Sequence, residues 1–230
     1  MTGLTSIERD CVERAMAAQA TMLRQVEAWA VVNSGSRNLD GLARVAGLIG
    51  DAFAALPGEL RLVDPAPVDA IDALGRPYDL PHGQHLHLTV RPEAPLQILL
   101  TGHMDTVFPV DHPFQALTWL DAGTLGGPGV ADMKSGIAIM LAALQAVEAS
   151  PGAASIGYEV VLNSDEEVAP LAAATTTVSP SFGFPISSKP MYAVKPGMPS
   201  TPRASDGCGI FGSSFVSPVP SETSYLCQPD

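Results

Sequence analysis

Residues 99–107 read Leu-Leu-Thr-Gly-His-Met-Asp-Thr-Val. The apolar run from Ile98 to Leu100 predicts a buried strand, and His103 and Asp105 follow where that strand leaves the core. Side chains two positions apart on an extended segment share one face, so these two groups can act together. A metal-binding histidine is often built this way, with one ring nitrogen on the metal and the other held by a carboxylate. A His-x-Asp tripeptide alone is more often a polar strand end in contact with water. The other motifs of the chain must therefore decide whether His103 and Asp105 belong to a metal site.

The composition is that of a folded, acidic protein. A chain of 230 residues with 46% hydrophobic residues can bury a sizeable core in one large domain or two small ones. The net charge of -12 argues against nucleic acid and anionic membrane surfaces as partners, because both require basic patches. The three cysteines are scattered, which favours a reducing compartment over a disulfide framework. We find no secretory signal or membrane span in the sequence and predict a cytoplasmic protein.

Helices are expected first along the chain. One helix, capped at Thr5 or Ser6, is predicted to run to Trp29, because its apolar residues keep a helical spacing. A second helix is predicted to begin near Asn38 or Asp40 and to run to Leu56, where Pro-Gly follows and stops it. These two helices precede a series of strands.

Short strands are expected at residues 60–63 and within 68–74. Residues 85–90 alternate polar and apolar side chains, which predicts a half-exposed strand. His85 and His87 share one face of it; a metal pair is conceivable, but a solvated face is favoured because no acidic residue stands close by in sequence. With the strand–helix–strand order that follows, this succession predicts an α/β layered domain.

A carboxylate follows the next glycine-rich loop. Residues 126–136 read Gly-Gly-Pro-Gly-Val-Ala-Asp-Met-Lys-Ser-Gly, and an apolar helix is predicted directly after them. Asp132 therefore lies at a loop-to-helix junction. An isolated aspartate at such a place is more often only a helix cap.

Three adjacent carboxylates end the next predicted strand, residues 156–163. Asp165, Glu166 and Glu167 repel one another, so they form either a solvated acidic turn or a cluster that cations neutralise. Ligand sites in α/β sheets gather at the carboxyl ends of strands. His103, Asp132 and Glu167 together therefore predict a site for zinc, cobalt or manganese.

Three segments in this order resemble the M20 metallopeptidases, which include glutamate carboxypeptidase, acetylornithine deacetylase, succinyl-diaminopimelate desuccinylase and aminoacylase. They are Leu-Leu-Thr-Gly-His-Met-Asp-Thr, Gly-Pro-Gly-Val-Ala-Asp-Met-Lys-Ser-Gly and Asn-Ser-Asp-Glu-Glu, and the resemblance covers residues 5–168. The residues of the second segment most resemble the glutamate carboxypeptidase-like branch of the family. One departure is Ser135, which stands where the family usually has a second glycine.

The resemblance implies a three-layer α/β catalytic domain of the zinc-exopeptidase type and a two-zinc amidohydrolase. His103 would bind one metal while Asp105 orients its ring, and Asp132 would bridge both metals. Glu167 would bind a metal and Glu166 would be the general base. It also implies a cis peptide bond after Asp132, a peptide or N-acyl amino acid substrate and a homodimer.

The resemblance stops near Val168. The family's later ligands are an acidic residue and a C-terminal histidine, but the last histidine in the chain is His112. Residues 169–230 are rich in Pro, Ser and Thr, carry no net charge and show no helical or strand period, so we predict an irregular, non-homologous tail. The lid or dimerisation domain has no recognisable counterpart. We hypothesise a lost reading frame or truncation; an M20-like continuation in another frame past codon 168 would support it, and its absence would contradict it.

Two functions follow from the sequence. The first is a zinc-dependent hydrolase that cleaves a peptide or N-acyl amide bond next to a carboxylate. The second is an inactive truncated remnant, or a metal-binding or interaction fragment, that lacks the later ligands and the lid domain.

Overall fold

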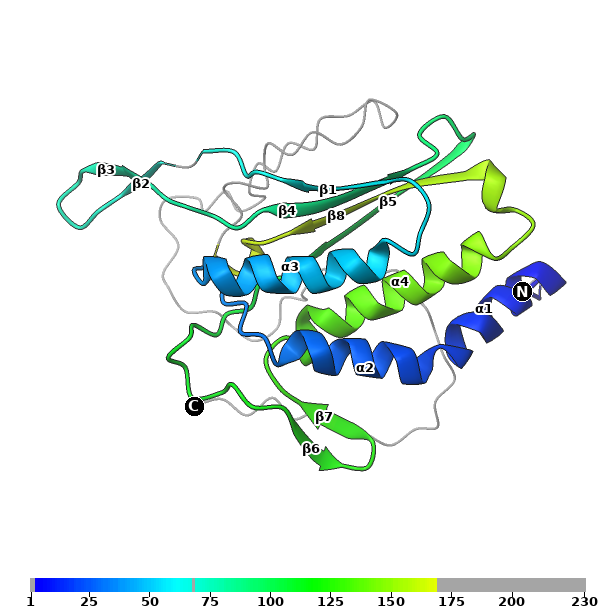
Figure 1. Cartoon of the computed structure of the whole chain (residues 1–230), viewed down its shortest axis with the longest axis horizontal. Helices are drawn as coiled ribbons and strands as arrows, with labels where there is room; N and C mark the ends of the chain where they lie inside the picture. The colour runs from blue at the N-terminus through cyan, green and yellow to red at the C-terminus, as the bar shows by residue number, and fades with distance from the viewer. Residues whose placement is uncertain (1–2, 68, 169–230) are drawn as a thin grey trace, which may run out of the picture. The chain divides into compact units, whose positions relative to one another are not determined.

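The computed structural model of the protein describes residues 3–67 and 69–168 (Figure 1). The helices are α1 (Ser6–Ala17), α2 (Gln19–Ala30), α3 (Leu39–Phe53) and α4 (Ser135–Glu148). The strands are β1 (Glu59–Val63), β2 (Asp69–Ile71), β3 (Pro77–Asp79), β4 (His85–Val90), β5 (Leu96–His103), β6 (Thr118–Asp121), β7 (Thr124–Gly126) and β8 (Ile156–Asn163). The predicted tail, residues 169–230, lies outside the described residues.

The main sheet has the strand order β1-β4-β8-β5. Strand β4 is antiparallel to both of its neighbours, whereas β5 and β8 run parallel, in a register that pairs Leu96 with Ile156 and His103 with Asn163. The carboxyl ends of β5 and β8 therefore meet at one edge of the sheet. This register brings together two motifs that are sixty residues apart in sequence.

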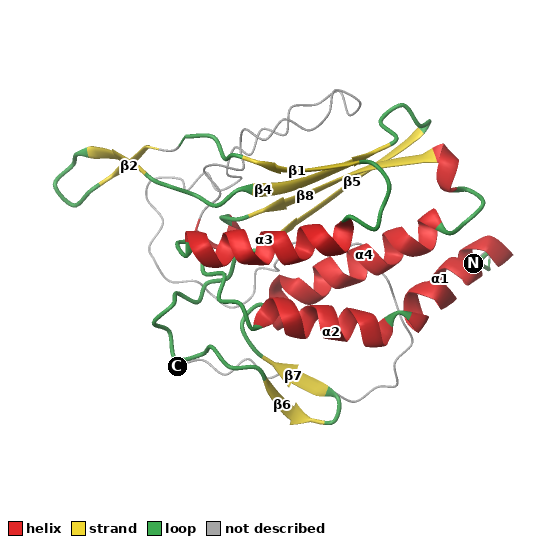
Figure 2. Cartoon of the chain, viewed as in Figure 1, coloured by secondary structure: helices red, strands yellow, loops and turns green. Residues whose placement is uncertain are grey.

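The described helices cover one face of this sheet (Figure 2). Buried side chains from α2, α3 and α4 form one hydrophobic core with the inward-facing residues of β4 and β8, among them Leu86, Leu88, Tyr158, Val160 and Leu162. The predicted α/β class is confirmed. The described residues supply the sheet and one helical layer, and they contain no lid domain.

The expected first helix is in fact two helices. The Thr5 cap is confirmed, since its side chain and that of Glu8 form a reciprocal capping box. Ala18 is both the C-cap of α1 and the N-cap of α2, which begins at Gln19. Helix α1 has no buried residue, whereas α2 buries Val26, Trp29 and Ala30 in the core. The apolar spacing did not reveal this division, because no glycine or proline marks it.

The helix α4 fills the centre of the helical layer. With the turn before it, it forms the one described stretch, Val130–Glu148, that is long and apolar enough to cross a membrane by length and composition. Six of its residues are buried, and they include Ile137 and Leu141 in the hydrophobic core. We therefore assign it as the core helix of the domain.

The prediction of a half-exposed β4 is wrong. His85 is fully buried and His87 is 8% exposed. The reason is that β4 lies between β1 and β8 rather than at an edge, and its second face lies in the interior near Asp165 and His82, whose charges act on His85. The two histidines also belong to no described group of side chains with metal-ligand spacing.

Burial of His87 predicts a loss of stability in acid. Burial and the charges of His85 and Arg61 lower the pKa of His87 from 6.5 to about 4. The unfolded chain takes up this proton first as the pH falls, so stability is expected to drop between these two pH values, by on the order of 3 kcal/mol. Urea unfolding of the parent and of His87→Leu across this window measures the effect. Identical pH dependence in the two proteins would contradict it.

Candidate metal centre

His103 ends β5 with its ring between two carboxylates. Its Nδ1 lies 3.1 Å from the backbone carbonyl oxygen of Asp105 and 3.3 Å from the Oδ1 atom of that residue. Its Nε2 lies 3.1 Å from Asp132 Oδ1. Burial would lower the pKa of His103, but hydrogen bonds to Asp105 and Asp132 outweigh it and raise the pKa to about 9. A cation can replace the proton on Nε2, because Asp105 holds the opposite side of the ring.

Asp105 joins three segments of the chain through one buried carboxylate. Besides His103, it accepts hydrogen bonds from Ser36 Oγ at 2.7 Å and from the backbone N–H groups of Glu166 and Glu167 at 3.2 and 3.1 Å. Burial raises the pKa of Asp105, yet these hydrogen bonds bring it below its ordinary value. Asp105 therefore orients the ring of His103 and fixes the two glutamates relative to it.

Asp132 is presented by a tight turn that two glycines make possible. Gly129 has φ +72°, and an added Cβ there would lie 2.9 Å from Thr106 and 3.1 Å from Lys134. A Cβ on Gly102 would lie 2.7 Å from the methyl group of Met133, so the turn packs closely against the end of β5. The Asp132–Met133 peptide bond is cis, as the resemblance implied. The Asp132 side chain is 76% exposed and faces His103 from the solvent side.

Lys134 anchors the other end of this turn. Its side chain is buried, and its Nζ donates hydrogen bonds of 3.2 Å to the carbonyl oxygens of Trp29 and Val32. These carbonyls lie at the end of α2, where a cation is favourable. Burial lowers the pKa of Lys134 to about 8. The lysine thus ties the Asp132 turn to the loop that carries Ser36, a link that the sequence did not reveal.

Glu167 is the third group of the site. One ligand atom each from His103, Asp132 and Glu167 lie within 4.8 Å of one another, and this is the one such group in residues 3–67 and 69–168. Burial raises the pKa of Glu167; His103 opposes this effect, while Asp132 and other neighbouring carboxylates add to it. A bound cation would relieve this repulsion. Two carboxylates and an imidazole are also a donor set that suits zinc.

Glu166 and Asp165 differ sharply in environment, although they are neighbours. Glu166 is exposed, and its charge acts on His103. Asp165 is fully buried, and its Oδ2 lies 3.1 Å from His82 Nδ1. The sequence offered a solvated acidic turn or neutralisation by cations, but Asp165 follows neither, because a histidine binds it. His82 is a residue that the sequence gave no means of finding.

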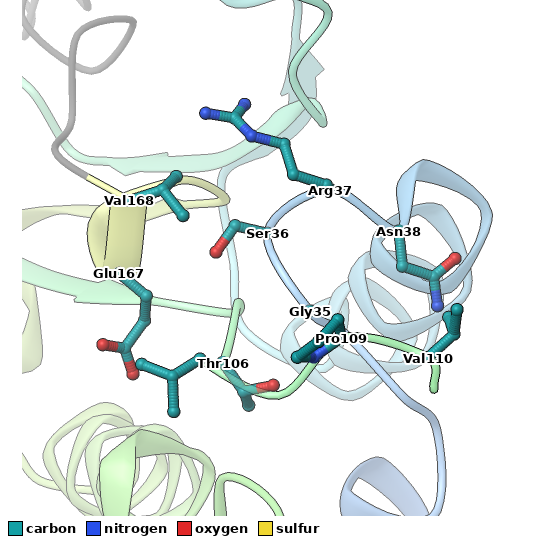
Figure 3. Close-up of a pocket in the computed structure, with 10 residues that line it drawn as sticks. Gly35, Ser36, Arg37, Asn38, Thr106, Pro109, Val110, Glu167 and Val168 are labelled. Carbon is teal, nitrogen blue, oxygen red and sulfur yellow. The ribbon is translucent and has the colours of Figure 1, made fainter. Parts of the chain in front are cut away.

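An open cavity of about 450 Å³ lies beside the site. Glu167 and Val168 line it on one side, and the loops around Ser36 and Pro109 line the other (Figure 3). The two loops are joined, since Ser36 N–H donates to Thr106 O at 3.3 Å and Thr106 N–H donates to Ser34 O at 3.0 Å. Arg37 is also part of the lining and is exposed. A small molecule in this cavity would contact Glu167.

The geometry brings all five predicted site residues together. His103, Asp132 and Glu167 form the group with metal-ligand spacing, Asp105 holds the ring of His103, and Glu166 follows on the same turn. Their roles as ligands, base and orienting residue stay predictions.

Sequence comparison finds a similarity to one peptidase family. Residues 99–198 match the sequence model of peptidase family M20/M25/M40. Succinyl-diaminopimelate desuccinylase 2 from Shewanella loihica is 43% identical over 81 residues, which are 33% of this chain and 21% of that enzyme. The matched segment, residues 99–198, is similar to peptidase family M20/M25/M40, and each of the two matches covers less than half of the chain. The M20 match includes residues 169–198, and the boundary that we place at residue 168 stays a prediction.

Three solved peptidase structures share the fold. Human carnosine dipeptidase 1 aligns with a TM-score of 0.56 at 20% identity, over 74% of this chain and 37% of that one. The dipeptidase Dug1p from Saccharomyces cerevisiae aligns with a TM-score of 0.58 at 15% identity, over 74% and 36%. The M20 metallo-carboxypeptidase Sso-CP2 from Sulfolobus solfataricus gives 0.52 at 14% identity, over 66% and 32%. The chain thus spans about a third of the length of these relatives.

Proposed function

We propose that this chain is a member of peptidase family M20 and carries the first half of a metal-dependent amidohydrolase centre, with His103, Asp132 and Glu167 as ligands of a divalent cation. The proposal rests on the close approach of the three side chains, whose ligand atoms lie within 4.8 Å of one another. The Asp105 carboxylate supports it, because it lies 3.3 Å from Nδ1 of His103 and so leaves Nε2 to face the cation. Zinc is the expected ion, and cobalt or manganese would suit the same donor set.

The proposed hydrolysis assigns different roles to the adjacent residues Glu166 and Glu167. The cation, when bound, supplies Lewis acidity toward the scissile carbonyl and an activated water. Glu166 is the proposed general base, which takes a proton from that water and passes it to the leaving amine. Its exposure suits this role, because a base must reach the substrate. The Asp105 carboxylate accepts the backbone N–H group of Glu166 and so keeps this residue in place.

The proposed substrate is a small peptide or an N-acyl amino acid with a carboxylate next to the scissile bond. Two relatives of the same fold are dipeptidases and a third is a carboxypeptidase, which supports this class. The exposed guanidinium of Arg37, on the lining of the cavity beside Glu167, is suited to bind the substrate carboxylate. We propose glutamate carboxypeptidase-like specificity, a reducing, cytoplasmic setting and, for the complete domain arrangement, a homodimer.

A second candidate is a metal-binding fragment without turnover. It is favoured by the single group of three possible ligands in residues 3–67 and 69–168, which suffices for one ion. This candidate shares the cation site with the first and differs from it only in turnover.

Metal analysis and hydrolysis assays on dipeptides and N-acyl amino acids separate the two candidates. For the enzyme, Glu166→Gln is expected to lower kcat by at least about 100-fold while the bound metal stays, because only the proton transfer is removed. The matched control is Glu93→Gln, an exposed glutamate in the turn after β4, which is expected to behave as the parent. A parent chain that binds metal but shows no turnover would contradict the enzyme and establish the fragment.

A further inference from the structure

A buried contact between a histidine and a carboxylate fixes the acidic turn, which we define as residues 164–167. The side chains of His82 and Asp165 are 1% and 0% exposed, and His82 Nδ1 lies 3.1 Å from Asp165 Oδ2. A carboxylate accepts hydrogen bonds, so in this contact the hydrogen lies on His82 Nδ1, which also lies 3.5 Å from Arg37 Nη1. Removing a charge from water is costly unless partners compensate it, and the imidazole is one of the partners of Asp165.

The same segment around His82 makes a second contact with the acidic turn. Ser164 Oγ donates a hydrogen bond of 2.6 Å to the carbonyl oxygen of Gly83, and both groups are buried. His82 and Gly83 thus bind two consecutive residues at the beginning of the turn. The contact spans more than eighty residues of sequence, from the loop before β4 to the end of β8.

Asp105 holds the other half of the turn. Its carboxylate accepts the backbone N–H groups of Glu166 and Glu167. The first two residues of the turn are therefore fixed by side-chain contacts with the loop before β4, and the last two by a residue that follows β5. A rotation of the turn would have to break both sets of contacts.

We propose that His82 is a positioning residue of the cation site: by holding the Asp165 carboxylate inside the protein, it makes Glu166 and Glu167 the carboxylates that face the cation. Three consecutive acidic side chains can otherwise compete for one cation. The proposal rests on the proposed function only for the identity of the site as a cation site. The geometry of the turn is independent of it.

The first test is amide hydrogen exchange of the metal-free protein. His82→Leu removes the hydrogen-bond donor at similar volume and is expected to speed exchange at Glu166 and Glu167 by at least about tenfold. His82→Gln keeps a donor and is expected to restore much of the protection. If the leucine variant does not fold, the double variant H82L/D165N, which also removes the buried charge of Asp165, takes its place with the same expectation.

The second test uses cobalt(II) as a spectroscopic probe. In the leucine variant, cobalt affinity is expected to fall about 10- to 100-fold and the visible absorption spectrum to change, as for other residues that support metal ligands. His87→Leu is the matched control, since His87 is also buried and lies in the neighbouring strand β4. It is expected to change stability but neither the spectrum nor the exchange at the turn.

Parent-like exchange in His82→Leu, or equal effects of His87→Leu, would overturn the role of His82. A parent chain that binds no cobalt would instead overturn the proposed function. The exchange measurement then still decides whether His82 holds the turn.

Discussion

Replacement of Asp105 by alanine is expected to cost about 3–5 kcal/mol of the free energy of unfolding in the metal-free protein and to weaken metal binding about 10- to 100-fold. The variant leaves His103 without the partner of its Nδ1. It also leaves the Ser36 hydroxyl and the N–H groups of Glu166 and Glu167 without their acceptor. Each buried donor without a partner costs about 1–3 kcal/mol.

Urea unfolding and zinc titration of Asp105→Ala measure the two effects. Ser36→Ala is the matched control, because it removes only one of the hydrogen bonds to the same carboxylate. It is expected to cost about 1 kcal/mol and to leave metal binding nearly unchanged. Equal effects of the two substitutions would show that Asp105 does not organise the site.

Replacement of Lys134 by methionine is expected to cost about 1–3 kcal/mol, and replacement by alanine about 2–4 kcal/mol. Methionine keeps most of the apolar packing, but it removes the hydrogen bonds that Lys134 Nζ donates to the carbonyls of Trp29 and Val32. The Trp29 carbonyl still accepts the N–H group of Val32 at 3.3 Å. Alanine additionally removes buried methylene groups.

Denaturant unfolding of both variants tests the role of Lys134. Arg24→Met, an exposed change on the same helix α2, is expected to stay within about 0.5 kcal/mol of the parent. If Lys134→Met is as stable as the parent, the lysine does not cap α2. The cost of burying its charge then offsets both hydrogen bonds.

The parts of the structure that sequence predicts are those with a local signal. The strand ending at His103 and the strand over residues 156–163 follow from apolar runs, and parallel pairing of such strands brings their carboxyl ends together. The grouping of His103, Asp132 and Glu167 was therefore foreseeable. So was the cap at Thr5, where the capping box lies within four residues.

The remaining features depend on contacts between distant residues. Asp165 binds His82, and Lys134 binds carbonyls of α2 about a hundred residues away, so no local pattern reports either contact. The alternation of polar and apolar residues in β4 predicted one solvent-exposed face, but a strand inside a sheet can bury polar side chains on its second face. Thus His85 is buried beside groups that are remote in sequence.

The central claim is that His103, Asp132 and Glu167 bind one divalent cation. Its most direct test is equilibrium titration of the metal-free chain with zinc near neutral pH, next to His103→Ala. We predict one tightly bound ion per chain and a loss of affinity of at least about 100-fold in the variant. A parent chain that binds zinc no more tightly than His103→Ala would contradict the claim.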